Sequence, residues 1–173
     1  MPRDAEKLAR LMLFRHVPEK DIVHLCRVAK PVSFQIGDEV FSQGDRADSA
    51  LLVVEGRLIA KVGGRDVGDS KSGEIVGETA LFFRDGKRSA SVVAAEITHC
   101  LILDNEVLQT SPYNPAIVAI ENHLLGSIAR RIRGSDRVIQ RIWKESGSQD
   151  GKLELKGGPT LRERLVGFFG GGR

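Results

Sequence analysis

The sequence predicts an α+β fold that is mainly β, with a small antiparallel barrel or roll between two short helices and one long helix. Three observations predict it. Between residues 29 and 104, apolar pieces recur roughly every ten residues, and turn residues separate them. Before this region, apolar residues recur at helical spacing. After residue 115, a helical pattern continues to about residue 145.

The composition indicates one ordinary globular domain with a few appended helices. The chain has 173 residues, of which 41% are hydrophobic and 28% charged. A net charge of +3 is too small to indicate a nucleic-acid or membrane surface. No apolar run approaches the roughly 18 residues of a membrane span, and the amino-terminal residues lack an apolar signal core. We therefore expect a cytoplasmic protein, with Cys26 and Cys100 reduced inside apolar stretches.

Two short helices are predicted over residues 4–14 and 19–28. Pro18 lies near the start of the second, where a missing amide hydrogen costs little. The apolar residues that set the helical spacing are Leu8, Leu11, Met12, Ile22, Val23 and Cys26.

The strand-like pieces follow from residue 31 onward. Gly-Asp or Gly-Gly pairs separate several of them, as expected of strands joined by tight turns. Residues 73–90 interrupt this rhythm, and their glycines and isolated charges predict a short helical turn inside a loop. The pieces are PVSFQ, EVFSQ, ALLVVE, RLIAKV, SASVVAAE and THCLILD.

The long helix, about residues 115–145, carries a heptad seam. Such a seam is typical of a two-stranded coiled coil with a second copy, and also of a helix packed on its own domain; the sequence leaves both open. Ser135 occupies the polar slot of the seam, and its apolar members are Leu125, Ile128, Ile132, Ile139 and Ile142.

Residues 146–173 open with a polar linker and offer a short amphipathic helix from Thr160. Its apolar face either packs back on the domain or docks on a protein partner. The residues that form this face are Leu161, Leu165 and Phe168.

The loop between residues 73 and 90 carries the chemistry. Arg88 can bind a phosphate through two directional hydrogen bonds, and Glu78 can accept one from a sugar hydroxyl. The amides of Thr79, Ala80 and Ser89 can add donors, as in other backbone anion sites. Gly77 permits close backbone approach, while Ala80 and Ala90 keep the wall small. These residues predict a site for a small ligand with a free hydroxyl and one anionic phosphate.

This loop resembles the phosphate-binding cassette of the cyclic nucleotide-binding domain family. The family pattern, Gly-Glu-x-Ala/Gly-Leu followed by Arg-Ser/Thr-Ala, stands here as GETAL and RSA. VFSQGDRADSALLVVEGRLIAKV and ASVVAAEITHCLIL also resemble the family's strands, so the resemblance covers roughly residues 8–145. Val76, Thr79 and Lys87 depart from the commonest family residues without removing a ligand contact.

The resemblance implies an eight-stranded antiparallel β-roll, jelly-roll-like, with amino-terminal helices and a long carboxy-terminal helix that closes over the pocket. Residues 1–145 would form this domain, with 146–173 as linker and tail. The implied function is that of a second-messenger receptor rather than an enzyme. Cyclic AMP is favoured over cyclic GMP, because a threonine in place of Ser89 would have favoured guanine. Residues 130–138 also resemble a closing helix of the family, which places Ser135 near the base.

The expected output is a dimer or a protein partner. Residues 146–173 are too few for a DNA-binding, kinase or channel domain, so none is expected in this chain. The alternative is a constitutive protein-interaction module that keeps the fold but senses no ligand. No membrane partner is expected, and no metal site, because the histidines are scattered: His16, His24, His99 and His123.

Overall fold

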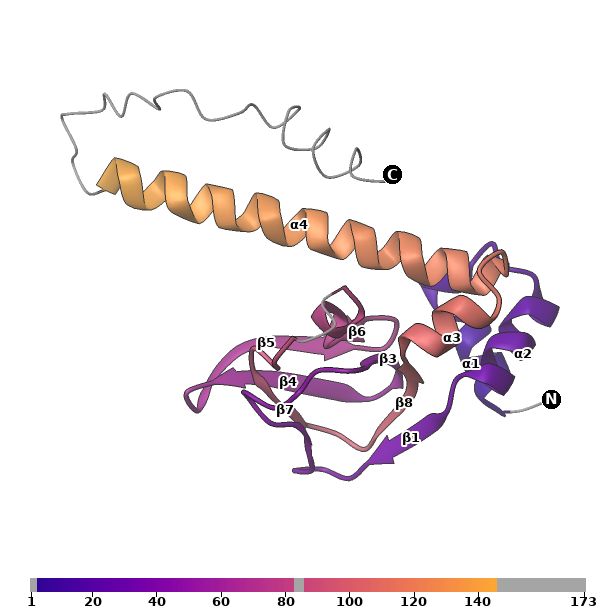
Figure 1. Cartoon of the computed structure of the whole chain (residues 1–173). Coiled ribbons are helices and arrows are strands. Elements are labelled where there is room, and N and C mark those ends of the chain that lie inside the picture. Colours follow the sequence, from indigo (N-terminus) through magenta and orange to yellow (C-terminus); the bar gives the residue numbers. More distant parts are fainter. Residues whose placement is uncertain (1–2, 83–85, 146–173) are drawn as a thin grey trace, which may run out of the picture. The chain divides into compact units, whose positions relative to one another are not determined.

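The computed structural model describes residues 3–82 and 86–145 of the chain (Figure 1). The chain separates into two compact units, residues 1–130 and 131–173. The first unit contains the strands and most of the helices. The domain boundary expected near residue 145 stays a prediction.

The amino-terminal region folds into helices where the sequence predicts them. The first expected helix consists of α1 (Arg3–Ala9) and a 3-10 turn η1 (Met12–Phe14), and α2 is Glu19–Val28. Leu11 has an extended backbone and separates the first two pieces. One face of these helices is buried in a core cluster that they share with one sheet, through Leu8, Phe14, Ile22 and Leu25.

The strands form two four-stranded antiparallel sheets, with the orders β1-β8-β3-β6 and β2-β7-β4-β5. Together they make the mainly β roll that the sequence predicts, with eight strands within the described residues (Figure 1). Their bounds are β1 Pro31–Phe34, β2 Glu39–Phe41, β3 Ala50–Glu55, β4 Arg57–Val62, β5 Arg65–Lys71, β6 Ile75–Val76, β7 Ser91–Ala94 and β8 Thr98–Leu103.

Strand β3 is the centre of the roll, because both of its faces are buried. Successive side chains of a strand point to opposite faces. Leu52 accordingly belongs to the core cluster beneath the helices, whereas Leu51 and Val53 belong to a second cluster of residues from both sheets. The continuous apolar run ALLVV therefore reports a strand buried on both sides.

Three elements have no counterpart among the pieces that the sequence analysis named. Strand β5 is almost entirely exposed, so it lacks an apolar alternation and is held by pairing with β4. Strand β6 has two residues. Helix α3 (Asn105–Thr110) has six residues. Asp104 caps it, because its carboxylate accepts a hydrogen bond from the Val107 amide at 2.8 Å.

Helix α4 (Pro115–Glu145) has the predicted bounds. In the first unit, it buries a face that differs from the heptad seam, made of Ala116, Ile117, Ile120 and Leu124. Of the seam residues, Leu125 is 60% exposed, Ile139 is 48% exposed and Ile128 is half-buried. The side chains of Ile132, Ser135 and Ile142 lie outside the described part of the structure, as do Leu161, Leu165 and Phe168 of the tail.

Candidate functional site

The backbone that carries Arg88 is held by the loop between β2 and β3. The Arg88 amide donates to the Asp45 carbonyl at 2.8 Å, and the Gly44 amide donates to the Arg88 carbonyl at 2.9 Å. The Ala47 amide adds a third bond, to the Gly86 carbonyl at 2.9 Å. The Gly-Asp turn after EVFSQ therefore reverses the chain and also positions the backbone of residues 86–88.

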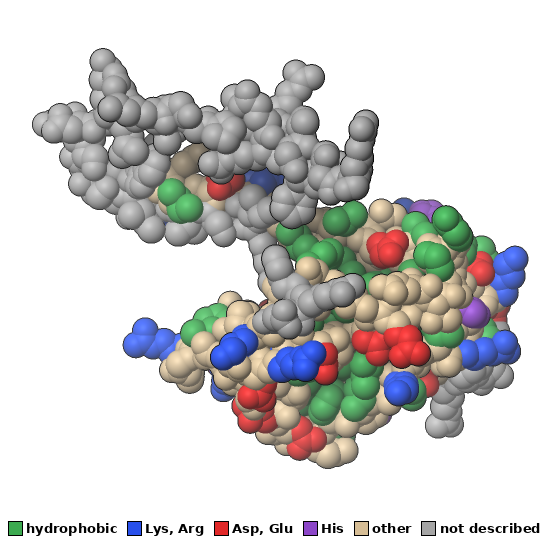
Figure 2. All heavy atoms as spheres, in the orientation of Figure 1, with side chains coloured by type: hydrophobic (Ala, Val, Ile, Leu, Met, Phe, Trp, Pro, Cys, Tyr) green, Lys and Arg blue, Asp and Glu red, His purple; other side chains and the backbone are tan. Residues whose placement is uncertain are grey.

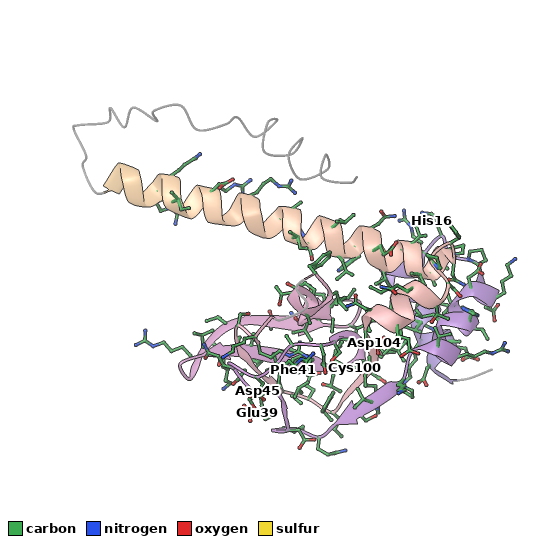
Figure 3. The ribbon with its side chains drawn as sticks, viewed as in Figure 1. His16, Glu39, Phe41, Asp45, Cys100 and Asp104 are labelled. Carbon is green, nitrogen blue, oxygen red and sulfur yellow. The ribbon has the colours of Figure 1, made fainter. Side chains whose placement is uncertain are left out.

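Arg88 is 7% exposed, and its side chain is fixed on two sides. Its Nη1 donates to the Ser49 carbonyl at 2.6 Å, and its guanidinium carbon lies 3.6 Å from the centroid of the Phe41 ring. Figure 3 shows Phe41 and Asp45 on the same side of the roll, one from β2 and one from the loop that follows it. The site thus holds a buried cation on a carbonyl oxygen and an aromatic face.

The positive charge of Arg88 is only weakly compensated by its carboxylate neighbours. Burial lowers the pKa of Arg88, and Asp48 and Asp45 oppose that shift to a smaller extent. Arg88 Nη2 lies 3.8 Å from Asp48 Oδ1, and the Asp48 side chain is 76% exposed, so solvent screens this ion pair. An anion bound at the guanidinium would offset the cost of burying the charge.

Gly77 brings the cassette backbone against this cation. Its φ of +77° lies in the left-handed region that favours glycine. A Cβ at this position would lie 2.7 Å from Arg88 Nη1 and 2.9 Å from Phe41 Cε2. Gly77 therefore precedes the 3-10 turn η2 (Glu78–Leu81) at a place where a side chain has no room.

Two hollows flank these residues. One, of about 270 Å³, is lined by Phe41, Ser49 and Arg88 among others. The other, of about 730 Å³, is lined by Ala80, Leu81 and Phe82 of the cassette and by part of α3. Arg46 and Asp48 line both. The larger hollow lies in the volume range of small-molecule sites, about 300–1,000 Å³.

The predicted site residues are brought together in part. Arg88 Nη1 lies 3.5 Å from the Gly77 carbonyl, while Glu78 and Ala80 are each 3% exposed on η2. Thr79 is half-buried on the same turn. After Arg88, Ser89 is exposed and Ala90 is half-buried. Ser135 belongs to residues 131–173, the second unit, so its predicted ligand contact stays a prediction.

No sequence pattern indicated the side of the site that β2 and its loop provide. Phe41, Asp48 and Ser49 all contact the Arg88 guanidinium. They stand about forty residues before it in the chain, and their local pattern reads as a strand and a turn. The backbone hydrogen bonds between residues 44–47 and 86–88 and the antiparallel bridge between Arg46 and Lys87 make the two segments neighbours.

The described residues were expected to hold neither a metal site nor a membrane span. Across residues 3–82 and 86–145, the structure contains no cluster of three or more His, Cys, Asp or Glu side chains placed to hold a metal ion. Over the same residues, no helix combines the length and the apolar composition needed to cross a bilayer.

Comparison with known proteins assigns the roll to a family. Residues 31–111 match the model of a family described as "Cyclic nucleotide-binding domain". The chain contains a cyclic nucleotide-binding domain. The match includes every contact described above for Arg88, and it confirms the family that the cassette pattern indicated. The family's description names ligand binding, which is the function that the cassette pattern indicated.

Among curated relatives, the cyclic nucleotide-binding domain is 32% identical to a putative potassium channel protein of Rhodopseudomonas palustris, over 72% of this chain and 28% of that protein. It is also 32% identical to a cAMP-dependent protein kinase regulatory subunit of Dictyostelium discoideum, over 58% of this chain and 33% of the relative. The chain thus spans a third or less of the length of these relatives.

Among solved structures, the domain resembles the catabolite activator protein of Thermus thermophilus. The two chains are 28% identical, with a TM-score of 0.63 over 75% of this chain and 62% of the other. A cyclic nucleotide-binding domain from Methylobacillus flagellatus, 22% identical, shows the same fold with a TM-score of 0.62 over 79% of this chain and 81% of that one. These likenesses confirm the predicted β-roll with its amino-terminal helices.

Proposed function

We propose that this chain is a cytoplasmic receptor for a cyclic mononucleotide and that it prefers cyclic AMP to cyclic GMP. The observation that carries the proposal is the Arg88 guanidinium, which is buried, held by the Ser49 carbonyl and the Phe41 ring, and bordered by a hollow. A cyclic phosphate carries one negative charge and fits a planar donor of this kind.

The cassette supplies the other contacts. Glu78 accepts a hydrogen bond from the ribose hydroxyl, while Gly77, Ala80 and Ala90 leave room for the sugar and phosphate. The amides of Thr79 and Ser89 donate to the phosphate. The Ala80 amide already donates to the Gly77 carbonyl at 3.1 Å, so the ligand shares it. Ser135 contacts the base.

Magnitudes support this division of roles. A micromolar ligand requires about 8 kcal/mol of binding free energy. Each charge-assisted hydrogen bond contributes roughly 1.5–3 kcal/mol, so two bonds from Arg88 supply about half of the total. The ribose contact and base stacking must supply the remainder.

The preference for cyclic AMP rests on Ser89. A threonine after the arginine would add a contact that favours guanine, and this chain has serine there. The relatives include proteins named for each ligand, a cAMP-dependent kinase regulatory subunit and a cGMP-dependent protein kinase.

Titration calorimetry with cyclic AMP and cyclic GMP tests the proposal. We expect Arg88→Ala to weaken binding at least about tenfold, and Arg88→Lys to do so as well, because an ammonium cannot present the planar pair of donors. Arg65→Ala removes an exposed charge on β5 and should leave affinity unchanged. Thermal unfolding checks that each variant is folded. Equal affinity in Arg88→Ala would remove Arg88 from the site, and a wild-type protein that binds neither nucleotide would favour the constitutive interaction module.

The receptor's output would run through a second copy, a protein partner or both. Leu125 and Ile139 supply exposed apolar surface on the seam of α4, which supports pairing of two such helices. Light scattering should show a smaller mass for Ile139→Asp than for the wild type, with Gln140→Asp on another face as the control. The tail face of Leu161, Leu165 and Phe168 would dock an effector, and deletion of residues 157–173 should then abolish its capture.

A further inference from the structure

We propose that Phe41 is a positioning residue for the ligand-binding cation, and that the site depends on an aromatic ring at this position. The inference rests on the proposed function, since it concerns how Arg88 is presented to the cyclic phosphate. The observation behind it is the position of the guanidinium carbon over the Phe41 ring, 3.6 Å from the ring centroid.

The ring fixes a degree of freedom that the hydrogen bonds leave loose. Arg88 Nη1 donates strongly to the Ser49 carbonyl at 2.6 Å, but the contacts of the guanidinium with Gly77 O and Ser49 Oγ are long, at 3.5 and 3.4 Å. A guanidinium held by one short bond can still rotate about it. Stacking on a flat ring sets the plane in which the remaining N–H groups point.

The orientation matters because competing carboxylates line the same hollow. Glu39, Asp45 and Asp48 all border it, and Figure 3 shows Glu39 and Asp45 on the side of the roll that carries Phe41. Asp48 already lies 3.8 Å from Nη2. Without the ring, the guanidinium can turn toward these acids, and a phosphate must then displace them.

Phe41 is not a simple core residue. Phe41 is half-buried and packs against the second core cluster. The edge of its ring also faces Gly77, where an added Cβ would lie 2.9 Å from Phe41 Cε2. Phe34 on β1, also half-buried, packs against the same cluster. Phe34 therefore provides a matched control for the loss of aromatic packing without a described contact with Arg88.

The test compares Phe41→Leu, Phe41→Tyr and Phe34→Leu in cyclic AMP titrations. A partly desolvated cation–π contact corresponds to about a 5- to 30-fold change in an equilibrium constant. We expect Phe41→Leu to weaken binding by about that factor, and Phe41→Tyr and Phe34→Leu to stay within about twofold of the wild type. If Phe34→Leu weakens binding as much as Phe41→Leu, general packing explains the effect and the proposal fails.

A double-mutant cycle asks whether Phe41 acts through the guanidinium. Arg88→Lys has no planar group to orient, so Phe41→Leu should cost less affinity in that background than in the wild type. An equal cost in both backgrounds would overturn the proposal, because the ring would then act independently of the guanidinium.

A measurement on the free protein separates this inference from the proposed function. In ¹⁵N NMR spectra, the Arg88 Nε–H should be protected from solvent exchange in the wild type and in Phe41→Tyr, and should exchange faster in Phe41→Leu. This pattern supports the positioning role even if no cyclic nucleotide binds. Equal exchange in Phe41→Leu and the wild type would refute the positioning role, whatever the ligand titration shows.

Discussion

Substitution of Gly77 by alanine tests whether the cassette backbone is packed against the Arg88–Phe41 pair. Gly77 has a φ of +77°, and Gly64 in the β4–β5 turn has a φ of +78°. The two positions differ in their surroundings. A Cβ at Gly64 would meet nothing within 4 Å, whereas a Cβ at Gly77 would lie 2.7 Å from Arg88 Nη1 and 2.9 Å from Phe41 Cε2. Gly64→Ala is therefore a control with the same backbone strain and no crowding.

The magnitude follows from this comparison. A left-handed alanine costs roughly 1–2 kcal/mol at either site. At Gly77, the guanidinium and the ring must also move by about 0.5–0.7 Å to reach ordinary contact distances, which weakens the bond to Ser49 and adds about 1 kcal/mol. For a domain of this size, each kcal/mol lowers Tm by about 2–4 °C. We expect Gly77→Ala to unfold about 2–4 °C below Gly64→Ala.

Calorimetric titration with cyclic AMP supplies the second measurement. Because only the Gly77 substitution displaces the guanidinium, Gly77→Ala should bind several-fold more weakly than the wild type and Gly64→Ala should bind normally. If both variants have the same Tm and the same affinity, the close packing of Gly77 on Arg88 has no energetic consequence and the account of the site is wrong.

Two further predictions concern buried positions in the roll and in the amino-terminal helices. Gly56→Ala should destabilise the protein more than Gly77→Ala in a denaturant titration, because its Cβ would lie 2.5 Å from the Ile97 carbonyl oxygen and 2.7 Å from the Thr98 Cα, which are backbone atoms that cannot rotate away; a smaller loss would contradict this. Burial raises the pKa of Cys100 to about 12 and that of Cys26 to about 11, from 9.0. Both thiols should therefore alkylate slowly at pH 8 until the protein unfolds, and the unfolding free energy should fall as the pH rises above 9, since the unfolded chain loses these protons first. Rapid alkylation of the native protein would disprove the burial of the thiols.

Much of the architecture could be predicted because the pattern of apolar residues follows which positions are buried. The β3 run of five buried residues and the amphipathic pattern of α2 are direct records of burial. Strand β5 could not be predicted in this way, since its exposed residues are held by hydrogen bonds to β4, and main-chain pairing leaves no side-chain pattern. Helix α3 was missed for a related reason, because six residues are too few to establish a helical period.

The site residues within the cassette could be predicted from the sequence, but the residues that contact them from β2 and the β2–β3 loop could not. Gly77, Glu78 and Arg88 lie within one short segment, so their spacing alone indicates a shared task. Phe41 and Ser49 contact the same guanidinium from a different strand and loop. Their partnership depends on the pairing of residues 44–47 with 86–88, which is a property of the fold and has no local sequence signal.

This pairing also determines which parts of the roll are connected to a ligand bound at Arg88. Arg88 shares two backbone hydrogen bonds with the turn at Gly44 and Asp45, and that turn joins β2 of one sheet to β3 of the other. An anion that shifts the guanidinium would therefore also shift the loop that connects the two sheets, in addition to η2. Lysine could supply the charge, but its ammonium has no planar face for Phe41 and cannot bind the Ser49 carbonyl and a phosphate in one fixed plane. In the proposed receptor, the arginine serves both as the cation and as a link between the ligand and the β2–β3 loop. Because the stability that a ligand confers follows from its affinity, Arg88→Lys should lower the rise in Tm on adding cyclic AMP by the amount that its loss of affinity predicts.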